Sequence, residues 1–130
     1  MSKIEINEYV RTKDGEIGIF KGYNNNRKSQ WACKVELQGM KFWKYYAEDY
    51  IEKHSKQLTD LIEVGDIIKY RIDNISTTLE AKGYIEGIVD IADEEMLQRI
   101  KSDKNYNILE ILTKEQYMAN CYKVGGENGI

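Results

Sequence analysis

The chain has 130 residues, of which 42% are hydrophobic and 32% charged, and its formal net charge is −3. This composition provides enough apolar material for the core of one domain, or of two very small barrels that share an interface. No apolar run approaches the roughly 18 residues needed to cross a bilayer, and residues 1–5 hold no apolar stretch typical of a secretory signal. The sequence therefore predicts a cytoplasmic protein without membrane contact.

The two halves of the chain differ in charge. Residues 1–58 contain 11 Lys and Arg against 8 Asp and Glu, whereas residues 59–130 contain 8 against 14. A domain that binds nucleic acid over a broad surface is usually basic throughout, so this distribution disfavours that class but allows one basic end. We divide the chain into a net basic half, 1–58, and a net acidic half, 59–130, which can still form one continuous domain.

The basic half has the pattern of a β-meander. Aromatic and β-branched residues alternate with polar ones, Asp14-Gly15 provides a tight turn, and Gly18 predicts a bend inside a strand. These features predict a small, strongly bent barrel of the Src-homology-3 type. Residues 47–56, in which Tyr50 and Ile51 are the only large apolar residues among charges, predict a short helical turn or linker. The strands are expected at residues 6–12, 16–23, 31–37 and 41–46.

The acidic half predicts further strands and two short helices, so the expected fold class is α+β and β-rich. Asp93 can cap the first helix, and the capping-box pattern of residues 113–116 marks the start of the second. In one strand, alternation predicts a core-facing side made of Ile85, Val89 and Ile91. The strands are expected at residues 66–72, 83–91 and 108–112.

Three parts of the chain carry a resemblance to known proteins. They are residues 9–15, residues 54–56 with 60–66, and residues 111–117 with 122–124. In their order and rough spacing the chain resembles a group of uncharacterised phage and prophage proteins of low-GC Gram-positive bacteria. The resemblance implies a protein made in the cytoplasm of a bacterial host and supplies no catalytic residues. Small accessory proteins of that kind often act by binding, and some block host defence systems, which is an argument by analogy.

Catalytic and metal sites have little support in the sequence. His54 is the only histidine, any Ser-His or Cys-His catalytic pair would have to use it, and its polar neighbours predict a solvent-exposed side chain. Cys33 and Cys121 are far apart and are expected to be small buried hydrophobic residues. One histidine and two distant cysteines cannot form a usual zinc site. We expect no enzymatic activity, no cofactor and no metal.

Residues 21–46 combine basic and aromatic side chains. Six basic residues stand against a single acid, Glu36, and six aromatic residues are interleaved with them. Such a segment can bind nucleic acid by phosphate contacts and base stacking, or protein through an aromatic hot spot. It can also be ordinary barrel core with solvated lysines at a strand edge. The candidate binding residues are Trp31, Lys34, Lys41, Trp43, Lys44 and Tyr45.

The acidic half suggests the opposite kind of surface. Its acids can form a negative face of the sort that imitates phosphates, although a run of charges is usually only solvated. The leading hypothesis is a non-catalytic accessory protein that binds a host or phage protein, with a nucleic-acid-binding barrel as the alternative. The acids concerned are Glu80, Glu86, Asp90, Asp93, Glu94, Glu95 and Asp103.

Overall fold

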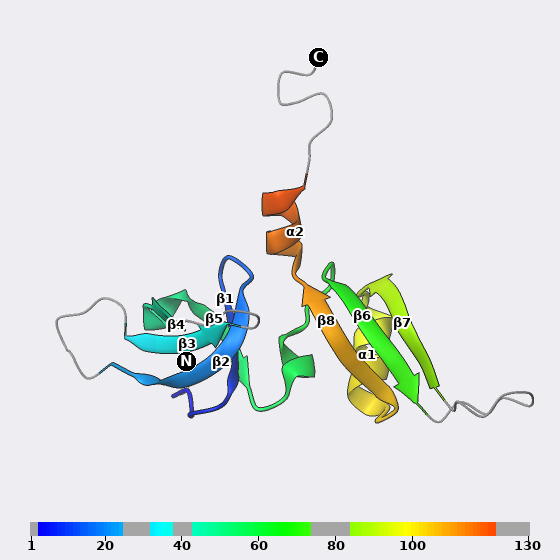
Figure 1. The fold of residues 1–130 in the computed structure, drawn as a ribbon, viewed down its shortest axis with the longest axis horizontal. Coiled ribbons are helices and arrows are strands. Elements are labelled where there is room, and N and C mark those ends of the chain that lie inside the picture. Colours follow the sequence, from blue (N-terminus) through cyan, green and yellow to red (C-terminus); the bar gives the residue numbers. More distant parts are fainter. Residues whose placement is uncertain (1–2, 25–31, 38–42, 74–83, 122–130) are drawn as a thin grey trace, which may run out of the picture.

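The fold is α+β and β-rich, as predicted, with two antiparallel sheets (Figure 1). The structure, a computed structural model, describes residues 3–24, 32–37, 43–73 and 84–121. A five-stranded sheet forms the N-terminal part, and a three-stranded sheet with two short helices forms the C-terminal part. Within the described ranges the strands form no closed barrel, and no helix is long and apolar enough to cross a membrane.

The N-terminal sheet has the strand order β4-β3-β2-β1-β5. Its first four strands match the predicted meander, but the prediction of a helical turn or linker at residues 47–56 is only partly right. A 3₁₀ helix, η1, is followed there by a fifth strand, whose charged residues concealed it. The strands are β1 (Tyr9–Thr12), β2 (Ile17–Tyr23), β3 (Cys33–Leu37), β4 (Trp43–Tyr46) and β5 (Ile51–Ser55), and η1 is Glu48–Tyr50.

Alternation along these strands builds one core. Val10, Phe20 and Val35 come from three neighbouring strands and are fully buried, because every second side chain of a strand faces the same side. Gly15 ends the turn after β1 with a φ of +84°. A Cβ at this position would lie 2.8 Å from that of Glu115, so glycine is required both for the turn and for close approach of the C-terminal part.

The C-terminal sheet has the order β7-β6-β8. Ile68 and Tyr70 of its central strand are buried in a cluster with Ile100 of the first helix, which lies behind the sheet in Figure 1. Both predicted helix starts are confirmed, since Asp93 accepts from the N–H of Met96 and Thr113 from that of Gln116. The elements are η2 (Leu58–Leu61), β6 (Ile67–Asp73), β7 (Tyr84–Ile91), α1 (Glu94–Ser102), β8 (Tyr106–Leu112) and α2 (Lys114–Asn120).

The predicted core face of β7 is wrong. Ile85, Val89 and Ile91 are exposed, and it is Ile88 that packs against the core. Gly87 has a φ of +79°, and the pairing with β6 shifts register beside it. A bulge of this kind resets the alternation of side chains along a strand, which a period-two reading of the sequence does not detect.

Candidate functional site

The exposed aromatic residues of the basic segment gather on the outer face of the N-terminal sheet. In the pairing of β3 with β4, Lys34 lies opposite Tyr45 and Glu36 opposite Trp43. Directly opposed residues of antiparallel strands share a face, and this face is opposite to the one that buries Val35. Trp43 is 47% exposed and Tyr45 46%. We call Lys34, Glu36, Trp43 and Tyr45 the aromatic face.

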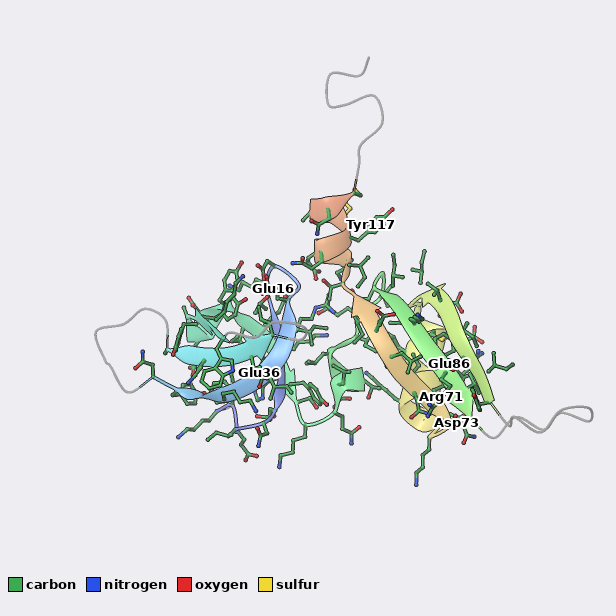
Figure 2. The ribbon with its side chains drawn as sticks, viewed as in Figure 1. Glu16, Glu36, Arg71, Asp73, Glu86 and Tyr117 are labelled. Atoms are coloured by element: carbon green, nitrogen blue, oxygen red, sulfur yellow. The ribbon has the colours of Figure 1, made fainter. Side chains whose placement is uncertain are left out.

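A cation–π contact organises this face. The Lys34 ammonium lies 3.4 Å from the centroid of the Trp43 ring, well inside the range in which such contacts are attractive. Glu36, labelled in Figure 2, lies 3.4 Å from the ammonium of Lys21 on the neighbouring strand β2. The aromatic face therefore presents two rings beside charges of both signs.

Lys44 points away from the aromatic face. It lies opposite Val35 in the ladder, and its ammonium is 3.2 Å from a carboxylate oxygen of Glu16. The hydroxyl of Tyr46 donates to the other oxygen of Glu16. Burial, together with this carboxylate, raises the pKa of Tyr46, which keeps the phenol protonated.

The structure thus unites only part of the predicted site. It brings Lys34, Trp43 and Tyr45 together and places Lys44 on the opposite face of the sheet. Trp31 and Lys41 lie outside the described residues. Each described lysine of segment 21–46 already has an intramolecular partner, as the Lys21, Lys34 and Lys44 contacts show.

His54 is not the solvent-exposed residue that the sequence predicted. It lies on β5, opposite Val10, with its side chain only 13% exposed and Nδ1 3.1 Å from a carboxylate oxygen of Glu8. Burial opposes ionisation of Glu8, but a hydrogen bond from the Glu5 N–H and the contact with His54 lower its pKa. The pair ties β5 to the segment before β1.

The two cysteines differ in burial. Cys33 is fully buried, as predicted, and burial raises the pKa of its thiol to about 11. Cys121 is only half-buried, so for this residue the prediction of burial is wrong. Among the residues that the structure describes, no group of three or more His, Cys, Asp or Glu is arranged to hold a metal ion.

Besides the aromatic face, the structure contains a buried ion cluster between the two sheets, which sequence reasoning missed. Arg11 leaves the outer face of β1 and is fully buried, as is Asp66, the residue just before β6. The guanidinium makes a two-pronged contact with the Asp66 carboxylate, at 2.5 and 3.0 Å. It also donates to the Leu61 carbonyl at 2.9 Å and to Glu115 at 2.6 Å. We call Arg11, Glu63, Asp66 and Glu115 the junction cluster.

Backbone groups complete the junction cluster. Asp66 accepts hydrogen bonds from the N–H groups of Glu63 and Lys114 at 2.8 and 2.9 Å. Burial alone would raise the pKa of Asp66, but Arg11 and these two donors lower it. The pKa of Glu63 is lowered in the same way, because the effects of Lys114 and Arg11 outweigh that of burial. The charges are therefore compensated, which is the condition for keeping ions in a protein interior.

The turn after β1 adds direct contacts with α2. The Thr113 hydroxyl donates to the Gly15 carbonyl at 2.7 Å, and the Gln116 side chain donates to the Asp14 carbonyl at 2.8 Å. Residues 9–15, 60–66 and 111–117, which are three of the segments quoted for the resemblance, contribute to this region, whereas residues 122–124 lie outside the described residues. The presence of Arg11 in the otherwise uncharged strand 9–12 was a sequence signal for the junction cluster, but nothing in the sequence identified the partners of Arg11.

The junction cluster predicts loss of stability in acid. The folded-state pKa values of Asp66 and Glu63 lie below their ordinary values, so their contribution is complete above the unfolded pKa of about 4 and is lost as pH falls through the folded pKa. We expect the urea concentration at the midpoint of unfolding to decrease once the pH is lowered below about 4. Arg11→Met should weaken this dependence, and an identical pH profile in the two proteins would contradict the assignment.

No protein-family model, no curated protein and no solved structure matches the chain.

Proposed function

We propose that this chain is a non-catalytic binding module whose aromatic face recognises a protein partner. The observation that carries the proposal is the exposure of Trp43 and Tyr45 side by side on a sheet, with Lys34 stacked on Trp43. Tryptophan and tyrosine are enriched at the energetic centres of protein interfaces. Both rings stand on β4, whose backbone is paired with β3, so this backbone is already ordered before binding.

The charges of this region favour a protein over a nucleic acid. Nucleic-acid affinity depends on cations that can replace the counterions of phosphates. Lys21 and Lys44 face Glu36 and Glu16, and Lys34 lies over the Trp43 ring. These partners compete with phosphate, whereas mixed charges around exposed rings suit the polar rim of a protein interface.

The proposed setting is the cytoplasm of a bacterial host that carries the gene on a phage or prophage. The partner is then a host or phage protein, and inhibition of a host defence system is the activity we favour. This setting rests on the resemblance of residues 9–15, residues 54–56 with 60–66, and residues 111–117 with 122–124. A barrel of the Src-homology-3 type is supported by the strand order β4-β3-β2-β1-β5, with η1 between β4 and β5.

The test is an affinity purification from lysate of a low-GC Gram-positive bacterium, compared between variants. The double variant Trp43→Ala, Tyr45→Ala removes two exposed rings and is expected to reduce recovery of the partner at least about tenfold, the effect of losing one good hot spot. Tyr117→Ala is the matched control, because Tyr117 is also an exposed aromatic but lies on α2 (Figure 2). No protein enriched above background, or equal recovery with all variants, would refute the proposal.

The nucleic-acid alternative is tested on the same proteins. Labelled single- and double-stranded oligonucleotides are titrated at low and at physiological salt, and we expect no binding even at low salt, where electrostatic attraction is strongest. Salt-sensitive binding that disappears in Trp43→Ala, Lys34→Ala would favour the alternative, because these two side chains share the aromatic face. That reading would use Trp31, Lys34, Lys41, Trp43 and Lys44.

A further inference from the structure

The outer strand of the C-terminal sheet is unusually open. Among the residues that the structure describes, β7 is hydrogen-bonded to β6 alone and ends the sheet on one side (Figure 1). Seven of its eight residues are exposed. A long exposed edge strand offers unpaired backbone donors and acceptors, which proteins usually protect with charged residues (lysine above all), proline or a β-bulge. β7 has neither lysine nor proline, and its acids and the bulge at Gly87 leave residues 88–91 as a regular edge.

Backbone contacts show which groups face the open side. Ala92, just after β7, donates its N–H to Asp66 at 2.7 Å and accepts from the Gly65 N–H at 2.9 Å. Both of its polar groups therefore point toward β6. Successive residues of a strand alternate in direction, so the N–H and C=O groups of Val89 and Ile91 point to the open edge.

The side chains of the same residues are apolar and solvent-exposed. Val89 is 59% and Ile91 67% exposed. The apolar surface continues across the sheet, because Ile91 of β7 lies opposite Ile67 of β6, which lies opposite Leu112 of β8. We call Val89, Ile91, Ile67 and Leu112 the apolar strip. The bulge at Gly87 interrupts the strand, which limits regular pairing with a further strand to residues 88–91.

Charge identifies the kind of partner. Residues 84–98, which form β7 and the start of α1, contain five acids and no Lys or Arg. Three of these acids have internal contacts, with Tyr70, the α1 N-terminus and Arg99. The other two are Glu86, an exposed acid of β7 that is labelled in Figure 2, and Glu94, an exposed acid at the start of α1. A complementary segment is extended and alternates apolar residues with Lys or Arg.

We propose that residues 88–91 of β7 bind an extended, basic segment of a partner protein by adding it to the sheet as a fourth strand. Backbone hydrogen bonds to Val89 and Ile91 supply affinity, and the acids select a basic sequence. This site is separate from the aromatic face, so it survives failure of the function proposed above.

The probe is a fluorescent eight-residue peptide that alternates lysine and valine, titrated against the full chain. We expect binding that weakens with salt and falls at least tenfold for two control peptides. One alternates glutamate and valine, and the other keeps the lysine–valine sequence but is methylated at every backbone nitrogen. Equal binding of the methylated peptide would overturn strand addition.

Two variants locate the site. Val89→Pro removes an N–H on the open edge and leaves the N–H groups paired with β6 in place, so we expect at least tenfold weaker binding. The double variant Glu86→Lys, Glu94→Lys preserves the backbone and is expected to weaken binding of the basic peptide severalfold at low salt. It keeps the test decisive if Val89→Pro does not fold. Trp43→Ala is the control that should bind normally. Unchanged binding in the charge-reversal variant would overturn the site.

Sedimentation of the chain without peptide identifies the occupant. A monomer at all concentrations supports a separate partner. Self-association abolished by Val89→Pro would mean that a second copy, and not a different protein, occupies β7.

Discussion

Replacing Arg11 with methionine is expected to lower the free energy of unfolding by about 3–5 kcal/mol, the cost of breaking a buried ion pair by removing one member. The Asp66 carboxylate would remain fully buried beside Glu63 and Glu115 with its main cationic partner gone. Urea denaturation at pH 7 measures the effect. The same change should also release the constraint that connects β1 to β6 and α2.

Two comparisons separate charge burial from general damage. Lys53→Met removes an exposed neighbour that is paired with Glu63 at 3.3 Å, and it should cost less than about 1 kcal/mol. The double variant Arg11→Met, Asp66→Asn should recover part of the loss, because no uncompensated buried charge remains at position 66. A loss below 1 kcal/mol for Arg11→Met alone would show that the junction cluster contributes little to stability.

The second large effect is expected for Phe20→Ala, at about 3–5 kcal/mol. Phe20 is fully buried at the centre of the N-terminal core and stacks edge-on against Tyr23 at 4.8 Å. Removing the ring leaves a cavity that the surrounding strands cannot close, since well-packed cores relax only partly. Ile19→Ala, on the other face of the same strand and only half-buried, is the matched control with a smaller loss.

This variant also tests whether the two sheets unfold together. Both tryptophans lie in residues 1–58, so tryptophan fluorescence reports on the N-terminal sheet, while hydrogen exchange of β6 amides reports on the C-terminal sheet. Because Arg11 and the Thr113–Gly15 contact connect the sheets, we expect the two probes to lose structure at one urea concentration. Separate transitions would mean two independent domains.

Local patterns in the sequence predicted the local structure. Alternation located the first four strands, and the side chains of Asp93 and Thr113 marked both helix starts. The predicted division after residue 58 falls inside η2. Prediction failed where a local rule was overridden, as in β7, where the Gly87 bulge reversed the expected core face, and in β5, where charged residues obscured a strand.

The candidate site was predictable only in part for a related reason. Alternation along a strand puts Trp43 and Tyr45 on one side and Lys44 on the other, but it does not show which side faces the core. That depends on packing over the sheet, which periodicity does not encode. The junction cluster joins Arg11 to residues 55 and 104 positions later, and no pattern within a strand or helix links such distant charges.

Those separations have a consequence for synthesis. At about 5–20 residues per second, a ribosome needs roughly 5–20 s to add the residues between Arg11 and Glu115. The N-terminal strands can pair during that interval, leaving the guanidinium of Arg11 on the surface of a partly made protein. Closure of the two sheets on each other is therefore expected to follow pairing of the N-terminal strands and to wait until Glu115 has been made.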